Sequence, residues 1–424
     1  MALFVLILLG FFILIAQHFF HFSKVRKLQG AFIPKEQPIL TSSNWFSGNY
    51  QDSLSIYLNE NIGFRNYFVR LNNQIAFSLF DFARANGVVV GKENFLYERN
   101  YIRAYLGKDY IGEAAIAEKV RKLEKIQDRL KKRDIELIVV FAPGKGSFYP
   151  EYIPTDQVPS ENNNYKTYVR LLNNTPINLI DFNKWFRKKK GTTVAPLYPK
   201  TGIHWSRFGE LMAADSLLKY IDKLKGIQLP QFNFTDTLYP DKTKFTDADI
   251  EEGMNLLFNI KDLQMAYPNY TVLKNESTNE TRAMVVADSY YWGLYGHGFA
   301  SDFLLNGQFW YYNEQVYESG RETRLVSELN VKEEIEQHNV VILLSTDANL
   351  NRFCYGFIDQ VYELYNITAE QELEERIQLM EKIIKSNEQW FSDIKEDAVK
   401  KGISVQKALR ENAEYMIWIK DKAE

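Results

Sequence analysis

The middle of the chain alternates between continuous apolar runs and stretches with helical periodicity, and this alternation limits the fold more than any other feature. The apolar runs are "ELIVVFAP" (136–143), "INLID" (177–181), "RAMVVADS" (282–289) and "NVVILLST" (339–346). Amphipathic stretches such as "EKVRKLEKIQDRL" separate them. Strands that are apolar on both faces and are joined by helices are typical of a parallel sheet with helices on both faces. We therefore predict an α/β fold of this kind.

The N-terminal segment "MALFVLILLGFFILIAQHFFHF", residues 1–22, contains no Asp, Glu, Lys or Arg. At ~1.5 Å per residue, a helix of this length reaches about 33 Å, which is enough to cross the apolar core of a bilayer. We predict an uncleaved transmembrane anchor. A cleaved signal peptide is the alternative, but the apolar run is long for one, no basic residue precedes it and no small-residue cleavage site follows it.

The remaining segments differ in pattern. Residues 23–86 are predicted to form a juxtamembrane and helical lead-in, and residues 87–367 the α/β domain, which begins with a hairpin over "GVVVGKENFLYE". A polar insertion, 225–281, interrupts the alternation of strands and helices. Residues 368–424 have helical apolar spacing and no strand pattern, so we predict a helical C-terminal appendage with a break at Gly402.

Composition excludes several classes of function. Apolar residues make up 46% of the chain, which argues against disorder. The net charge is -3 and no long block of like charge occurs, so we expect no nucleic-acid partner. The single cysteine, Cys354, excludes an internal disulfide, and its apolar helical context favours a thiol in the core. No cluster of His, Asp and Glu has metal-ligand spacing, so we predict neither a metal nor a cofactor.

Two segments carry residues that could do chemistry at the carboxyl edge of the predicted sheet. Ser289 ends a buried run, and His204 lies in the loop "TGIHW", just before a long helix that Ser206 can N-cap. A Ser at a strand end can act as a nucleophile, and a His on another loop can take its proton. Spacing alone leaves a second interpretation open, in which Asp288 and Ser289 cap the next helix and His204 packs beside Trp205.

Four motifs, taken in order, give the chain a resemblance to a known family. They are "GVVVGKENFLYE", "FAPGKGSFYPEYIP", "YPKTGIHWSRFG" and "VVADSYYWG". This series resembles the alginate O-acetyltransferase family of the AlgX and AlgJ type, whose members carry an SGNH-hydrolase-like domain. The resemblance covers roughly residues 28–365 and implies that the α/β domain has the SGNH-hydrolase-like fold. In the family the His motif precedes the Ser motif, as it does here.

The resemblance also implies roles for particular residues. Ser289 matches the family's nucleophile and His204 its general base. Lys145 and Trp205 match residues of the family motifs, and we predict that both contribute to substrate binding. Backbone N–H groups of Ser289 and Tyr290, at the start of a helix, are predicted to form the oxyanion hole.

Aromatic residues are dense after the Ser motif, in "SYYWGLYGHGF" and "FWYYNEQVY". Aromatic faces stack on sugar rings, and they equally fill protein cores. From these stretches we predict Tyr291, Trp292 and Tyr311 as substrate contacts.

One position departs from the family's pattern. The family's orienting Asp lies two residues before the His, and Gly202 stands there in this chain. Either another acid reaches His204, or the enzyme is weak, or the site only binds. Because Asp288 and Asp181 both follow strands at the same edge of the sheet, we predict that one of them orients His204.

The resemblance implies a membrane-anchored acetyltransferase that modifies an exported polysaccharide through an acetyl-Ser intermediate. Its acetyl groups would come from a multi-pass membrane O-acyltransferase. Two alternatives stay open: a non-catalytic polysaccharide-binding or scaffold partner of such a system, and a carbohydrate acetylesterase that uses water as acceptor. The sequence does not separate transfer from hydrolysis, and it identifies neither the acceptor, the acyl donor nor the oligomeric state.

The predicted location follows from the same resemblance. We predict a single-pass membrane protein with residues 23–424 outside the cytoplasm, in the periplasm. Lys24, Arg26 and Lys27 follow the span, and the positive-inside rule alone would place them in the cytoplasm. Long domains are translocated despite flanking charge, so the functional resemblance decides this prediction.

Overall fold

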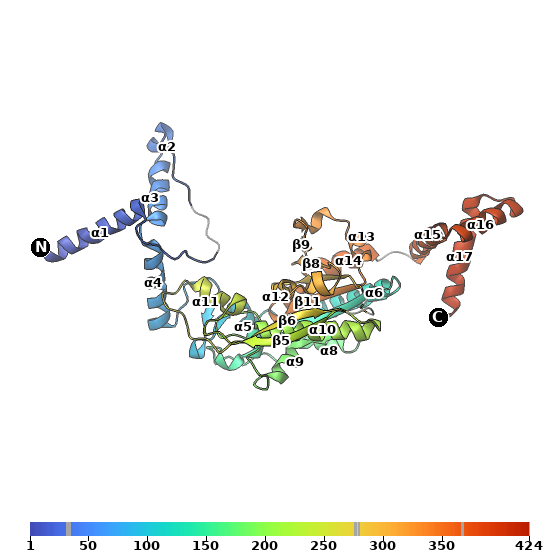
Figure 1. Ribbon diagram of the computed structural model, residues 1–424, viewed down its shortest axis with the longest axis horizontal. Helices are drawn as coiled ribbons and strands as arrows, with labels where there is room; N and C mark the ends of the chain where they lie inside the picture. The colour runs from blue at the N-terminus through green and yellow to red at the C-terminus, as the bar shows by residue number, and fades with distance from the viewer. Residues whose placement is uncertain (31–34, 275–277, 279, 366–368, 424) are drawn as a thin grey trace. The chain divides into compact units, whose positions relative to one another are not determined.

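The computed structural model places the predicted strands in one central sheet (Figure 1). It describes the residues in the ranges 1–30, 35–274, 278, 280–365 and 369–423. The chain forms two compact units, Met1–Ile358 and Asp359–Glu424. The sheet and the candidate site both belong to the first unit.

Within the described residues the central sheet has seven strands, in the order β10-β9-β8-β7-β11-β3-β4. Its parallel strands are β3 (Glu136–Ala142), β4 (Asn178–Asp181), β7 (Ala283–Ala287), β8 (Gln308–Tyr311) and β11 (Val340–Thr346). Each apolar run that predicted a strand contains one of these strands. The α/β prediction is therefore confirmed, and the carboxyl ends of β7, β11, β3 and β4 meet at one edge.

One side of the sheet departs from the parallel arrangement. The strands β9 (Gln315–Tyr317) and β10 (Arg324–Leu325) pair antiparallel beyond β8. The connection from β8 to β9 is only residues 312–314, which is too short for a crossover and permits only a hairpin. The sheet is therefore mixed at this edge rather than parallel throughout.

Helices cover both faces of the sheet, as predicted. Successive residues of β3 point to opposite faces, because side chains alternate along a strand. The Phe141 ring contacts the ring of Tyr168 on α8 (Asn164–Leu172), whereas Val140 lies in the core cluster that contains Phe182 of α9 (Phe182–Lys189). The other helices around the sheet are α6 (Glu113–Lys131), α10 (Arg207–Lys225), α12 (Tyr291–Gly296) and α13 (Val331–Glu336). The helix α14 (Phe357–Tyr365) spans the boundary between the two units.

The His motif leads into α10, which begins where the sequence predicted. The Ser206 side chain accepts a hydrogen bond from the Gly209 N–H at 3.0 Å, so Ser206 is the N-cap. Gly226 ends the helix with a φ of 64°, a left-handed conformation that favours glycine.

Cys354 is buried, as predicted for a core thiol.

The segment before the sheet contains helices, one hairpin and the loops that connect them. Its helices are α1 (Ala2–Phe20), α2 (Ser42–Phe46), α3 (Asn49–Asn61), α4 (Arg65–Phe80) and α5 (Arg99–Tyr105), and its hairpin consists of β1 (Val88–Val90) and β2 (Leu96–Glu98). In the part of the chain that is described, α1 is the one helix long and apolar enough to cross a membrane, with a mean hydropathy of 2.5. Most of α1 is exposed, unlike the core helix of a soluble protein.

The polar insertion folds as a small lobe beside α10. The strands β5 (Gln231–Leu238) and β6 (Tyr267–Leu273) pair antiparallel, and the long connection between them carries the short helix α11 (Asp249–Met254). The start of α11 lies against the loop that holds His204, because Ile203 N donates to the Asp249 side chain at 2.9 Å. An insertion that the sequence marked only as polar therefore reaches the candidate site.

Helices make up the second unit. It contains most of α14 and the helices α15 (Ala369–Ser386), α16 (Glu388–Lys401) and α17 (Val405–Ala423). The last three share a core that includes Ile384, Ile394 and Leu409. The predicted break lies at Gly402, which ends α16 with a φ of 64°. The remaining short helix of the first unit is α7 (Lys145–Phe148), directly after β3.

Candidate active site

Ser289 and His204 meet at the carboxyl edge of the central sheet. Ser289 follows β7, and His204 lies on the loop between α9 and α10. The Ser289 hydroxyl oxygen lies 2.9 Å from Nε2 of His204, within hydrogen-bond distance. The structure therefore brings together two residues that the sequence placed on separate motifs, 85 positions apart.

The acid that contacts His204 is Asp249, which the sequence did not identify. Its Oδ2 lies 2.5 Å from Nδ1 of His204, and its Oδ1 accepts a hydrogen bond from Ile203 N. Asp249 is the first residue of α11 in the insertion. The carboxylate is therefore fixed by the backbone next to the imidazole that it orients. The sequence around Asp249, "DADIEE", shows only that a helix with an acidic first turn begins there. No sequence pattern connects this stretch to the His motif.

The prediction that Asp288 orients His204 is wrong. Oδ2 of Asp288 accepts hydrogen bonds from Thr346 N at 2.8 Å, from the Thr346 hydroxyl at 2.9 Å and from Asn349 Nδ2 at 2.9 Å. Its Oδ1 accepts from Tyr290 N at 3.1 Å. The carboxylate thus joins the ends of β7 and β11 and supports the turn that carries Ser289.

The prediction for Asp181 is also wrong. This residue N-caps α9, because its Oδ1 accepts from Lys184 N at 2.8 Å. Its Oδ2 accepts from the Tyr165 hydroxyl at 2.8 Å. An acid at the end of a strand and the start of a helix is held by the free N–H groups of that helix, so it does not reach His204.

The absence of a side chain at Gly202 has a structural reason. A Cβ atom built there would lie 2.5 Å from the Thr246 carbonyl oxygen and 2.8 Å from that of Asp247. Contacts below 3.0 Å with backbone atoms require the backbone to move. The insertion therefore occupies the space next to position 202 and supplies the acid, Asp249, from a different segment.

Further contacts fasten the insertion to the His204 loop. The Asp262 side chain accepts from Lys200 N at 2.8 Å and from Thr201 N at 3.1 Å. Glu251 N donates to the Thr201 carbonyl at 3.2 Å. Together with the bond from Ile203 N to Asp249, these bonds hold the residues on both sides of Gly202 against the insertion, so they set the position of His204 relative to Asp249.

Gly202→Asp is expected to destabilise the protein without improving catalysis. The new side chain collides with two backbone carbonyls, and overpacking of this kind typically costs about 1–3 kcal/mol of the free energy of unfolding. Thermal unfolding and ester hydrolysis of the variant measure the two effects. Gly226→Asp, at an open helix end with nothing within 4 Å, controls for a new charge, although its positive φ adds some strain of its own. A rise in activity for Gly202→Asp would contradict this account.

Lys145 is an internal residue, and its burial corrects the prediction that it binds substrate. Its side chain is fully buried, and Nζ donates to the carbonyls of Lys200 at 2.7 Å and Gly202 at 2.6 Å. Burial lowers the pKa of Lys145 to about 7. The residue therefore ties the His204 loop to the end of β3, because a buried ammonium group must find acceptors and these carbonyls provide them.

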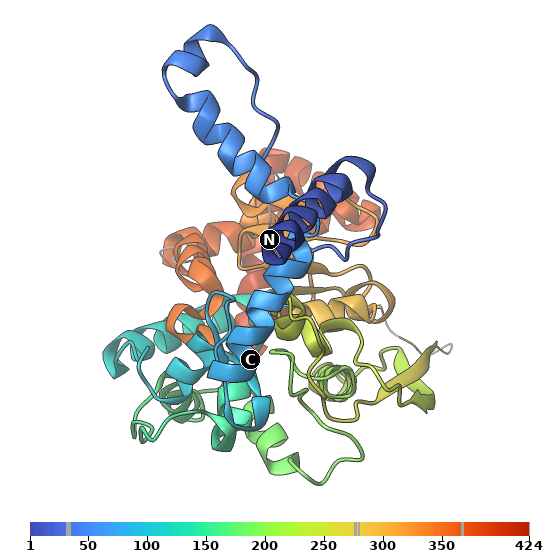
Figure 2. The ribbon, with the colours of Figure 1, turned by 90° about the vertical axis from the view of Figure 1, so that its left-hand side faces the viewer.

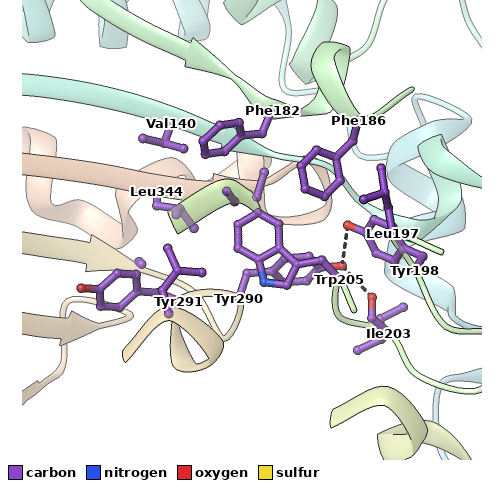
Figure 3. Packing of buried hydrophobic residues seen from close by; sticks show 14 of the residues in the cluster. Val140, Phe182, Phe186, Leu197, Tyr198, Ile203, Trp205, Tyr290, Tyr291 and Leu344 are labelled. Atoms are coloured by element: carbon purple, nitrogen blue, oxygen red, sulfur yellow. Dashed lines mark hydrogen bonds between the residues drawn. The ribbon is translucent and has the colours of Figure 1, made fainter. Parts of the chain in front are cut away.

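Trp205 is likewise a core residue and not a substrate contact. Figure 3 shows its indole enclosed by Phe182 and Phe186 on one side and Tyr290 on the other, and none of its surface is exposed. The Tyr290 hydroxyl donates to the Ile203 carbonyl at 2.6 Å. This aromatic cluster therefore supports the His204 loop from the side of the core.

The other predicted substrate contacts divide into buried and accessible residues. Tyr291 is fully buried, so it cannot reach a ligand. Trp292 and Tyr311 are half-buried, with ring centroids 5.5 Å apart. Tyr311 also lies 4.3 Å from the ring of Tyr312. Trp292, Tyr311 and Tyr312 therefore form a row of partly accessible rings.

The predicted oxyanion donors also need correction. Tyr290 N already donates to Asp288, as a residue two positions after an Asp commonly does, so it is not available for a second acceptor in this conformation. A side chain that the sequence missed is Tyr312, whose hydroxyl lies beside the Ser289 side chain. Burial raises the pKa of Tyr312, so the phenol keeps its proton at neutral pH. The N–H of Ser289 stays a predicted donor.

The charges around His204 stabilise its protonated form. Burial disfavours the imidazolium, but the attraction and the hydrogen bond of Asp249 outweigh it, and the pKa of His204 is raised above 6.5. The buried Glu210 adds a smaller attraction. A His that binds a proton more readily is a stronger base toward the Ser289 hydroxyl.

The pH profile of the protein is expected to carry this signature. A general base must be neutral, so kcat/KM falls as the pH drops through the pKa of His204. Because that pKa is raised, the acid limb has its midpoint above about 6.5, the ordinary value for His. In Asp249→Asn the attraction is gone, and the midpoint of the residual activity moves to lower pH. An acid limb at the same pH in both proteins would contradict the assignment.

Metal ligands do not gather at this site. Among the residues that the structure describes, no group of three or more His, Cys, Asp and Glu side chains is placed to hold a metal ion. The contacts that the site does show, from a hydroxyl to an imidazole and from that imidazole to a carboxylate, suit nucleophilic and acid–base chemistry.

Comparison with known proteins gives one match to a family model and several similar structures. Residues 88–280 match the model described as "SGNH hydrolase-like domain, acetyltransferase AlgX", a range that includes His204 and Asp249 and ends before Ser289. No curated protein matches the chain.

Three solved structures illustrate the structural similarity. The O-acetyltransferase domain of Pseudomonas putida AlgJ has 14% identity and a TM-score of 0.42, over 66% of this chain and 99% of that chain. Pseudomonas aeruginosa AlgX has 17% identity and a TM-score of 0.41, over 64% of this chain and 67% of that chain. Bacillus cereus PatB1 with a sulfonyl adduct has 14% identity and a TM-score of 0.41, over 64% of this chain and 99% of that chain.

Proposed function

This chain carries an SGNH hydrolase-like domain of the AlgX acetyltransferase family, and from that premise we propose that it transfers acetyl groups through a covalent intermediate on Ser289. The observation that carries the proposal is the line of contacts from Ser289 Oγ to His204 Nε2 at 2.9 Å and from His204 Nδ1 to Asp249 Oδ2 at 2.5 Å. A nucleophile, a base and an orienting acid in this order are the parts that acyl transfer needs.

The first half of the reaction forms the acyl-enzyme. His204 Nε2 takes the proton of the Ser289 hydroxyl while Oγ bonds to the carbonyl carbon of the acetyl donor. The tetrahedral intermediate collapses, the bond to the leaving group breaks, and His204 returns the proton to that group. Asp249 accepts the Nδ1–H throughout, which keeps Nε2 free as the acceptor and stabilises the imidazolium.

The second half repeats these steps with a hydroxyl acceptor. The acceptor loses its proton to His204 and attacks the acetyl carbonyl, and the bond between carbonyl carbon and Ser289 Oγ breaks. His204 then returns the proton to Oγ. The oxyanion formed in each half receives a hydrogen bond from the Tyr312 hydroxyl, which lies beside Ser289 and stays protonated at neutral pH.

We place a sugar hydroxyl of an exported polysaccharide in the acceptor role. The half-buried rings of Trp292, Tyr311 and Tyr312 support this, because Tyr312 lies beside Ser289 and the other two rings continue from it. The apolar α1 supports anchoring in a membrane. We place residues 23–424 on the extracytoplasmic side, where an exported polysaccharide would be reached. A multi-pass membrane O-acyltransferase is the proposed source of acetyl groups.

The alternatives differ in what Ser289 does with its acyl group. The scaffold interpretation arose from the missing carboxylate at Gly202, and Asp249 removes that reason by filling the role from the insertion. The acetylesterase interpretation uses the same acyl-enzyme with water as acceptor. It is therefore distinguished by the product and not by the residues.

One experiment tests both questions. The full chain in detergent is mixed with para-nitrophenyl acetate, and nitrophenolate release is followed in the first turnover. A burst approaching one nitrophenolate per chain is expected from acylation of Ser289. Oligosaccharides, neutral or containing uronic acid, are then added, and mass spectrometry reports whether acetyl appears on sugar or as free acetate. A missing burst would refute the acyl-enzyme, and acetate alone would favour the esterase.

A further inference from the structure

Helix α4 exposes a long apolar face that carries no charge. Phe68, Leu71, Ile75 and Leu79 are each between 45% and 71% exposed. Their spacing of three and four residues puts them on one side of the helix. Between Asn66 and Phe80 the exposed positions on this side hold no Asp, Glu, Lys or Arg, whereas a helix face in contact with water normally carries charged residues.

The opposite face of α4 is fixed to the first unit. Arg70 donates to the Leu256 carbonyl at 3.1 Å, and Asn73 donates to the Met254 carbonyl at 2.8 Å. Phe77 is buried in the main core. The helix therefore lies between the folded unit on one side and whatever covers the apolar face on the other.

The apolar face of α4 continues into the surface of α1. An apolar groove of about 700 Å³ is lined by α1 residues, among them Phe11 and Leu14, and by Phe64, Tyr67 and Phe68 at the start of α4. Near the C-terminal end of α1, Nδ1 of His18 lies 2.7 Å from the carbonyl oxygen of Asn61, the last residue of α3. Because α1 itself is mostly exposed, the surroundings that cover α1 also reach Phe68.

The direction of the helices suits a bilayer. Figures 1 and 2 show α1 projecting to one side of the column formed by α3 and α4. When α1 stands across a membrane, α4 consequently lies along the membrane surface. The exposed basic residues Lys24, Arg26 and Lys27 directly follow α1, at the level where anionic headgroups would meet them.

We propose that α4 is an interfacial helix, which rests its Phe68–Leu79 face in the outer leaflet of the bilayer that α1 crosses. The inference depends on the membrane anchoring proposed above. It adds a second contact with lipid, made by a helix that lies parallel to the membrane surface. Two contacts would fix the distance and orientation of the Ser289 site relative to the membrane. Lipid is the occupant that the observations favour, because one apolar surface runs from α1 to α4 without a charged residue on the α4 face.

Fluorescent labels can locate this face directly. Ile75→Cys and Leu79→Cys are made in the full chain, labelled with an environment-sensitive nitrobenzoxadiazole dye and reconstituted in vesicles of phosphatidylethanolamine and phosphatidylglycerol. The parent chain is the labelling blank, because its Cys354 is buried. Both labels are expected to lose most of their emission to lipids with a nitroxide in the upper acyl chain, and little to iodide in the water.

Two further labels make the result decisive. Lys125→Cys, at an exposed position on α6, should respond to iodide alone. Leu8→Cys in α1 should respond to a nitroxide deep in the bilayer, which tests the anchor separately. If Leu8→Cys lies in lipid while the α4 labels respond to iodide, the inference is overturned and the anchor stands. Labels on α4 that neither quencher reaches would show that protein, such as a second copy, covers the face. A Leu8 label outside lipid would overturn the anchor, and the interfacial helix with it.

Discussion

Ser289→Ala is expected to abolish the burst of nitrophenolate and to lower ester turnover by about 10⁵-fold or more, as loss of the nucleophile does in serine hydrolases. The variant has no oxygen that can bond to the acyl carbon, while the rest of the site is unchanged. Stopped-flow absorbance gives the burst, and steady-state rates give the turnover. Because Ser289 is only half-buried, the thermal midpoint should stay within about 3 °C of the parent value.

The matched control for this change is Ser301→Ala. Ser301 is a half-buried serine of the same unit, whose hydroxyl contacts Gly298 O and Asp302 rather than His204. It should retain the burst in full. A normal burst in Ser289→Ala would mean that another residue is acylated, and the proposed function would fail at its first step.

Asp249→Asn is expected to lower kcat by about 10³–10⁴-fold with little change in stability, as the equivalent change does in serine proteases. The Asn carbonyl oxygen can still accept from Ile203 N, which turns its NH₂ group toward Nδ1 of His204. An NH₂ group there donates to Nδ1, so the proton of the neutral imidazole moves to Nε2. In that tautomer Nε2 cannot accept the proton of Ser289.

Asp181→Asn provides the comparison for Asp249→Asn. It removes a carboxylate of the same sheet edge, but one that caps α9 and contacts Tyr165 instead of His204. Its kcat should remain within about twofold of the parent, since Asn is itself a good N-cap. Equal losses in the two variants would mean that the effect is general electrostatics and not orientation of His204.

These two experiments together test the division of labour within the site. Ser289 acts on the acyl carbon directly, whereas Asp249 acts through His204. Loss of Ser289 should therefore leave no pH-dependent turnover to measure. Loss of Asp249 should leave a slow reaction whose acid limb has shifted, because His204 remains in place without its partner.

Four parallel strands could be predicted from sequence because each depends on local pattern, whereas the roles of Ser289 and His204 were predicted from the family resemblance of their motifs. A continuous apolar run needs burial on both faces, and only a covered sheet provides it for β3 and β11. The end of such a run fixes where Ser289 lies. The motif around His204, with Ser206 as N-cap, likewise fixes the start of α10.

The partner of His204 could not be predicted in the same way. Asp249 lies 45 residues further along the chain, on a polar insertion whose folding has no periodic signal. Gly202 indicated that the family's orienting acid is missing from its usual position. The close approach of the Thr246 and Asp247 carbonyls explains why no side chain fits there. Proximity of strand ends suggested Asp288 and Asp181, and local backbone donors hold both of them elsewhere.

By itself, the sequence determined four parallel strands, the helices on both faces of the sheet and the apolar α1, since these follow from residue patterns within single segments. The nucleophile–base pair was indicated by the family resemblance of four motifs in order. Only the tertiary structure decided which acid serves His204 and which motif residues are buried. Lys145 and Trp205 look like site residues in a motif, yet their accessibility depends on the packing of the whole unit, and both lie inside it. Burial and long-range contact are properties of several segments together, and no single segment of the chain encodes them.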